Sequence, residues 1–94
     1  MHARVVRFTN VTPERIEAVQ NRVDEQGGPP EGVESTGFKL LHDDSQGTAI
    51  FIGFFDDEEK LRKSSEVLEQ MDPDDTPGER ASVDLCEVKV ERDA

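Results

Sequence analysis

The sequence predicts an α+β fold in which two helices cover one face of a four-stranded antiparallel sheet. Three observations predict it. The run from Ala49 to Phe55 is apolar on both faces of a strand, a short turn ending at Gly47 precedes it, and two segments carry helix caps followed by apolar residues at helical spacing. We expect residues 1–94 to form a single domain of this kind.

Composition limits the core and the partners. The chain has 94 residues, 33% of them hydrophobic, and its 22 acidic and 11 basic residues give a net charge of −11. A domain of this size buries only about 60–65% of the surface of its unfolded chain, so the core of a monomer is lean. The negative charge repels phosphate backbones and anionic lipids, so neither nucleic acid nor a membrane is expected as a partner.

The cysteine and histidine content indicates the compartment and argues against metal chemistry. The single cysteine, Cys86, cannot form an internal disulfide, and no secretory leader is recognisable at the N-terminus. A cytoplasmic location is therefore expected. One cysteine and two histidines are too few for a zinc site, so we expect no metal.

The first half of the chain predicts a strand and a helix. Residues 2–9 are expected to form the first strand. The helix follows Thr12, whose hydroxyl can cap it, and it has Pro13 at its first position and Gly27 at its end. Its apolar side is formed by Ile16, Val19 and Val23.

The second half predicts three strands and a helix. Residues 35–42 and 49–55 are expected to pair through a five-residue turn, and the last strand is expected over residues 82–91, with a β-bulge near Leu85 and Cys86. Asp56 is predicted to cap the second helix, with Glu59 completing a capping box. The buried side of this helix is expected to contain Leu61, Ser64 or Ser65, Leu68 and Met71.

The central strand predicts self-association. Ile50, Ile52 and Phe54 point to one face of the sheet, whereas Ala49, Phe51 and Phe55 point to the other. Right-handed crossovers place both helices on the same face, so the other face stays uncovered in a monomer. We therefore expect a homodimer in which two sheets pack face to face.

The order of elements is that of the split βαβ, ferredoxin-like arrangement. Within it, the stretches Gly37–Leu41, Asp43–Gly47, Ala49–Phe55 and Asp56–Arg62 resemble the middle of antibiotic biosynthesis monooxygenase-like domains of the dimeric α/β barrel superfamily. The resemblance implies a dimeric barrel and cofactor-independent oxidation of an electron-rich aromatic such as a quinol or phenol. Relatives often have a tryptophan before the second helix, where this chain has Phe55, and haem breakdown is disfavoured because the chain has no tryptophan.

Several residues are candidates for the site, each with a simpler interpretation. His42 could act as a general base or be a surface histidine beside a turn, and Asn10 could contact a substrate or form an Asx turn. Ser64 and Ser65, with Gly37 and Gly53, could line a cavity or allow close packing. For each of these the simpler interpretation is favoured.

Three further residues carry similar alternatives. Arg4 and Arg7 could pair with Asp84 and Glu87 or face a ligand anion, and pairing is favoured. Cys86 is expected to be a small buried hydrophobe.

Two functions remain open from the sequence. The first is monooxygenase-like oxidation, with His42 as base and with Asn10, Ser64, Ser65 and Phe55 as substrate-binding residues. The second is a non-catalytic dimeric domain that binds a small hydrophobic or aromatic ligand or serves as an interaction module. An internal cavity containing a titratable side chain would favour the enzyme, whereas a filled core would favour the module.

Overall fold

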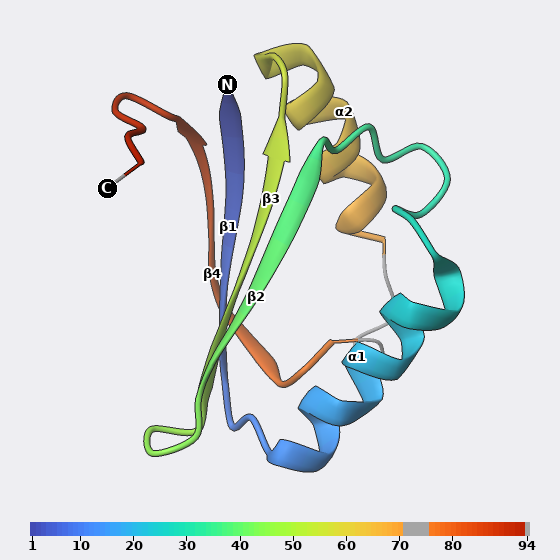
Figure 1. Ribbon diagram of the computed structural model, residues 1–94, viewed down its shortest axis with the longest axis vertical. Coiled ribbons are helices and arrows are strands. Elements are labelled where there is room, and N and C mark those ends of the chain that lie inside the picture. Colours follow the sequence, from blue (N-terminus) through green and yellow to red (C-terminus); the bar gives the residue numbers. More distant parts are fainter. Residues whose placement is uncertain (71–75, 94) are drawn as a thin grey trace.

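The computed structural model describes residues 1–70 and 76–93 (Figure 1). Its elements are β1 (His2–Thr9), α1 (Pro13–Gln26), β2 (Gly37–Asp43), β3 (Thr48–Phe55), α2 (Glu58–Leu68) and β4 (Glu79–Glu87). The four strands form one antiparallel sheet in the order β2-β3-β1-β4. The predicted α+β class and order of elements are therefore confirmed, and they are consistent with a ferredoxin-like fold.

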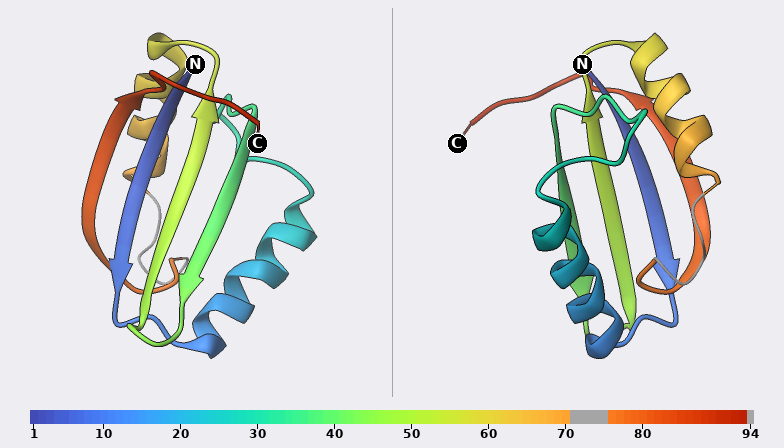
Figure 2. Two further views of the ribbon diagram at one scale, coloured as in Figure 1. Left: turned by 60° about the vertical axis from the view of Figure 1, so that its left-hand side comes forward. Right: turned by 90° about the vertical axis from the view of Figure 1, so that its right-hand side faces the viewer.

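Both helices lie on the same face of the sheet. Figure 1 views the sheet nearly edge-on with α1 and α2 to one side, and Figure 2 shows α1 towards one end of that face and α2 towards the other. We call this side the helix face and the opposite side the open face. The strand register assigns Phe51 and Val6 to the helix face, and Ile52 and Val5 to the open face.

Helix α1 has the predicted ends. The Thr12 hydroxyl accepts a hydrogen bond from the backbone of Arg15, Pro13 is the first helical residue, and Gly27 ends the helix at φ 67°, a left-handed conformation that suits glycine. The guanidinium of Arg15 also donates to the carbonyl of Thr76 at 2.8 Å, which ties α1 to the segment before β4. Ile16 is the buried residue of this helix.

Helix α2 begins one residue later than predicted. Asp57, not Asp56, is the cap, and its carboxylate accepts from the backbone N–H of Lys60 at 2.8 Å. The expected capping box with Glu59 is therefore wrong in register. The buried residues of the helix are Leu61, Ser64 and Ser65, and Leu68 is half-buried, while Met71 lies outside the described residues.

Strand β4 differs from the prediction in its ends and its irregularity. It pairs with β1 in continuous register from Ser82 to Glu87, and the register shift falls opposite Arg7 and Phe8. The bulge expected near Leu85 and Cys86 is therefore wrong. Cys86 is exposed, so the prediction of a buried thiol is also wrong. Because Cys86 lies opposite Ala3, it belongs to the open face, on which neither α1 nor α2 packs.

The core consists of two groups of buried side chains. The first contains Val6, Phe8, Val11, Ile16 and Ala49. The second contains Val33, Phe55 and Leu61, with Val67 and Leu68 packed against it. In the described residues, neither helix has the length and apolar character needed to cross a membrane.

Candidate functional site: a cavity between the sheet and the helices

A cavity of about 630 Å³ lies between the helix face of the sheet and the two helices. Side chains of both core groups form its walls, with α1 contributing Val19 and Val23 and α2 contributing Leu68. Its volume falls in the range of about 300–1,000 Å³ that is typical of small-molecule sites.

An aromatic surface forms the floor of the cavity. Phe38 of β2 stacks on Phe51 of β3, with ring centroids 5.2 Å apart and planes inclined by 9°. Phe55 follows on the same face of β3, and its ring lies over Gly53, where a built Cβ would be 3.4 Å from Phe55 Cε2. Phe38 is 42% exposed, so a ring that could pack in the core instead faces an accessible surface.

The cavity exists because α1 packs on the sheet at Ile16 and lies away from it beyond that residue. Val19 and Val23 continue the apolar side of the helix beyond Ile16, yet they are only half-buried and line the cavity. The segment after the helix, which contains Pro29 and Pro30, lines it as well. The short side chains on this part of α1 therefore leave a volume that the protein does not fill.

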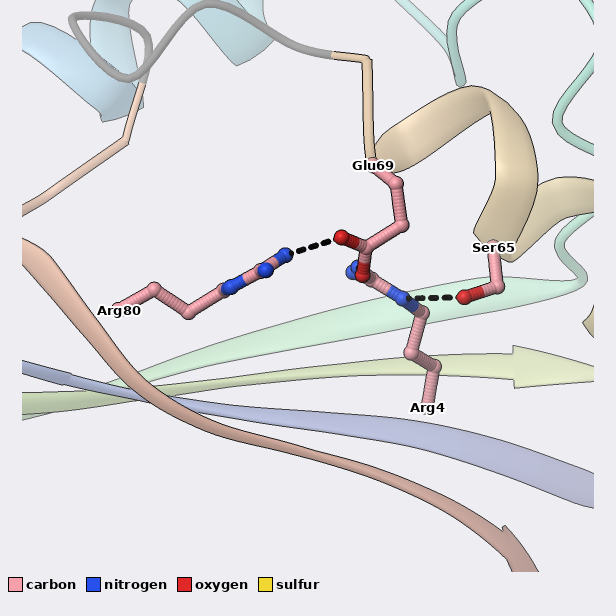
Figure 3. Close-up of polar contacts among 4 residues, drawn as sticks. All are labelled: Arg4, Ser65, Glu69 and Arg80. Carbon is pink, nitrogen blue, oxygen red and sulfur yellow. Dashed lines mark hydrogen bonds and ion pairs between the residues drawn. The ribbon is translucent and has the colours of Figure 1, made fainter.

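A charged cluster of Arg4, Glu69 and Arg80 forms the other wall of the cavity. Figure 3 shows these three side chains together with Ser65. The side chain of Arg4 on β1 is only 8% exposed. Its Nε donates to Ser65 Oγ at 3.2 Å, and its Nη2 donates to Glu69 Oε1 at 3.1 Å. The second carboxylate oxygen of Glu69 accepts from Arg80 Nη1 at 2.7 Å. One carboxylate therefore bridges two guanidinium groups, and both arginines line the cavity.

Burial and ion pairing shift the pKa values of Arg4 and Glu69 in opposite directions. Burial lowers the pKa of the Arg4 guanidinium, and the hydrogen bond and charge of Glu69 oppose that shift. The pKa of Glu69 is lowered, first by the hydrogen bond from Arg80 and also by Arg4, although burial acts the other way. Glu69 is therefore ionised at neutral pH and serves as the counter-ion of a buried arginine.

Replacing Glu69 by glutamine is expected to lower the free energy of unfolding by about 1–2 kcal/mol at pH 7, because Arg4 loses its counter-ion. Solvent screens the pair at Glu69, which is 42% exposed, and this keeps the loss small. Because the pKa of Glu69 in the folded protein lies below its usual value of 4.5, the ionised carboxylate stabilises the fold fully above pH 4.5. This stabilisation is lost as the pH falls through the lowered pKa. The difference between wild type and variant should therefore shrink below that pH.

Urea denaturation between pH 7 and pH 3 measures this difference. Glu66→Gln is the matched control, because Glu66 is an exposed residue of the same helix and its replacement changes the charge equally. Equal stability of the two variants at pH 7 would show that Glu69 is not the counter-ion of Arg4.

Among the predicted site residues, Phe55 lines the cavity, whereas Ser64 and Ser65 do not. Both serines are buried: Ser64 Oγ accepts from the backbone N–H of Glu34 at 3.0 Å, and Ser65 Oγ accepts from Arg4. Their small size and their hydroxyls thus serve the close approach of α2 to the sheet. Gly53 faces the cavity, but Gly37 falls on the open face.

His42 and Asn10 lie outside the cavity wall. His42 is an exposed residue of β2, next to the Asp43–Gly47 turn and opposite Ala49. Asn10 has a left-handed backbone at φ 53°, and its Nδ2 donates to Glu79 Oε2 at 2.7 Å. The structure therefore does not gather His42, Asn10 and Ser65 around one ligand.

The sequence analysis missed the bridging role of Glu69. Arg4 pairs with Glu69, the C-cap residue that follows α2, and not with the predicted strand carboxylates Asp84 and Glu87. A signal was present, because Arg4 alternates in phase with Val6 and Phe8 and must therefore point towards the helices. Glu69 lies four residues after Ser65, so at helical spacing the two residues share one side.

The described part of the chain, residues 1–70 and 76–93, contains no group of three or more histidine, cysteine, aspartate or glutamate side chains placed to hold a metal ion. Two comparisons with known proteins add no family to this description. The chain matches no protein-family model, and it matches no curated protein. What the protein does therefore has to be inferred from the cavity and the residues around it.

Proposed function

We propose that this protein is a homodimeric domain that binds a small hydrophobic, aromatic molecule in the cavity between its sheet and helices. The observation that carries the proposal is the cavity of about 630 Å³ with an aromatic floor. A flat ligand resting on Phe38 and Phe51 would cover rings that the protein leaves accessible, and burying apolar surface favours binding by about 25 cal/mol per Å².

The cavity does contain titratable side chains, Glu69 among them, but none of them suits the base that oxidation needs, so the geometry favours binding over oxidation. Oxidation of a quinol or phenol needs a base beside the substrate, and His42 does not line the cavity. The carboxylate of Glu69 is a weak base, because its pKa is lowered by two arginines. The resemblance to antibiotic biosynthesis monooxygenase-like domains agrees with a hydrophobic ligand in this position, and oxygen uptake with a bound quinol would add a reaction.

The proposed partner on the open face is a second copy of the chain. Apolar side chains that are only partly covered run across this face, namely Val5, Leu41, Ile50, Ile52 and Phe54. Leu41 is 48% exposed. Covering such a surface would add apolar burial to a domain whose own core is lean.

Charge also favours a second copy. Arg7 and Lys39 share the open face with Asp43 and Asp84, so these charges cancel, although the chain as a whole has a net charge of −11. Two copies can therefore approach through this face with little of the repulsion expected between their other surfaces.

The ligand-binding proposal is tested with N-phenyl-1-naphthylamine, an uncharged probe whose fluorescence rises in apolar sites. We expect the wild-type protein to bind it with micromolar affinity. Replacing both Val19 and Val23 by tryptophan should weaken binding at least about tenfold, because the new rings occupy the cavity.

The matched control places two tryptophans at Ala18 and Asn21, which are exposed on the same helix. This variant should bind the probe like the wild type, with circular dichroism confirming that both variants are folded. The proposal is wrong if the wild type does not bind the probe, or if the inner and outer variants bind it equally.

A further inference from the structure

We infer that the ligand of this cavity carries a single negatively charged group, such as a carboxylate, on an aromatic body, and that Arg4 and Arg80 receive that group. The inference rests on the proposed binding function and specifies the class of ligand. It is carried by the shared carboxylate of Glu69, the burial of Arg4 and the strand register around Gly53.

The cluster on the cavity wall has an excess of positive charge. Glu69 is the one carboxylate that the described structure places on Arg4 and Arg80, so the three side chains together carry one uncompensated positive charge. Arg4 is almost fully buried, and a buried guanidinium that shares its counter-ion is stabilised by a further anion. A monoanion would neutralise the cluster.

The two arginines also have hydrogen-bond donors to offer. A guanidinium has five N–H donors, and the hydrogen bonds of Arg4 within the described residues use Nε and Nη2. Arg80 uses Nη1 towards Glu69. Planar guanidinium groups hold a carboxylate through paired N–H donors, so the remaining donors at the cavity wall suit that group.

The strand register places the aromatic residue Phe38 in the same row of paired residues as Arg4, two strands away. Phe38, Gly53 and Arg4 are directly paired across β2, β3 and β1. Adjacent strands lie about 4.8 Å apart, so the Cα atoms of Phe38 and Arg4 are separated by about 10 Å. The ring of Phe55 covers Gly53 between them, so a flat two-ring molecule could lie along this row beside Phe55, with its rings against Phe38 and its charged end towards Arg4.

The test compares 2-naphthoate with its methyl ester, each displacing N-phenyl-1-naphthylamine from the wild-type protein. Both have the same two-ring body, and only the first has the charge. We expect 2-naphthoate to bind at least about tenfold more tightly, as a hydrogen bond to a charged group allows. Raising the salt concentration should reduce this preference and leave binding of the ester unchanged.

Two variants that change the charge of the cluster in opposite directions test the assignment. Arg80→Met should weaken 2-naphthoate binding about tenfold, because it leaves Arg4 neutralised by Glu69. Glu69→Gln should strengthen binding, because the cluster then keeps two positive charges. Neither variant should change binding of the methyl ester, a pattern that a merely structural role for the cluster would not produce.

Arg62→Met is the control, because Arg62 is exposed on α2, pairs with Glu58 and does not line the cavity. It removes the same charge and should leave both affinities unchanged. Equal binding of 2-naphthoate and its ester by the wild type, or a parallel loss of both in Arg80→Met, would overturn the inference while leaving cavity binding in place. Failure of the uncharged probe to bind would instead overturn the proposed function.

Discussion

Replacing Ile52 by lysine is expected to convert the proposed dimer into monomers at micromolar concentration. Ile52 lies at the centre of the open face, between Lys39 of β2 and Val5 of β1. In a two-fold symmetric interface the substitution occurs twice, once in each subunit. Each lysine would either bury its ammonium group in the interface or force the surrounding apolar side chains to stay exposed to water. The dissociation constant should rise about 100-fold or more.

Sedimentation equilibrium measures this change in oligomeric state. Gln20→Lys is the control, because Gln20 is exposed on α1 and the charge changes by the same amount. Leu41→Lys is a second test at a residue that is 48% exposed, where a loss of folding is not expected. A wild-type protein that is monomeric at micromolar concentration, or an Ile52→Lys variant that remains dimeric, would contradict the proposed interface.

Replacing Gly78 by alanine should lower the free energy of unfolding by about 3 kcal/mol. Gly78 is buried beside the end of β1, and a Cβ at this position would lie 2.8 Å from Val11 Cγ2 and collide with the carbonyl oxygen of Thr9. Because a backbone oxygen cannot rotate away as the end of a side chain can, the strand itself would have to move.

Gly37→Ala is the matched control, because nothing lies within 4 Å of a Cβ built at Gly37. This variant should be as stable as wild type or slightly more stable, since alanine restricts the unfolded chain more than glycine does. Urea denaturation of the two variants provides the comparison. Similar unfolding midpoints for both would rule out the close approach of Gly78 to β1.

Local signals were sufficient to predict the elements and the two faces of the sheet. Thr12, Pro13 and Gly27 mark the ends of α1 through interactions that span only a few residues. The alternation of β3 assigned Ile52 and Phe51 to opposite faces, as the register confirms. The sequence predicts Asp56 as the cap in place of Asp57 because two adjacent aspartates offer the same capping carboxylate. Only the residue at which β3 ends distinguishes them.

The candidate site depended on contacts that no short stretch of sequence contains. Arg4 meets Glu69 across 65 residues of chain, and Arg80 meets the same carboxylate across 11. Such pairs form only when α2 has packed on β1 and β4 has joined the sheet. His42 was singled out for its chemistry alone, and the packing left it exposed outside the cavity wall.

The sequence by itself thus determined which segments become helices and strands and which side of each is apolar, because periodicity and capping act over one or two turns. Tertiary structure alone decided where space remains between α1 and the sheet. The positions of whole elements set the volume between them, and the cavity is the part of that volume that the side chains do not fill. It also decided that a buried arginine shares one carboxylate with a second arginine at the edge of that space.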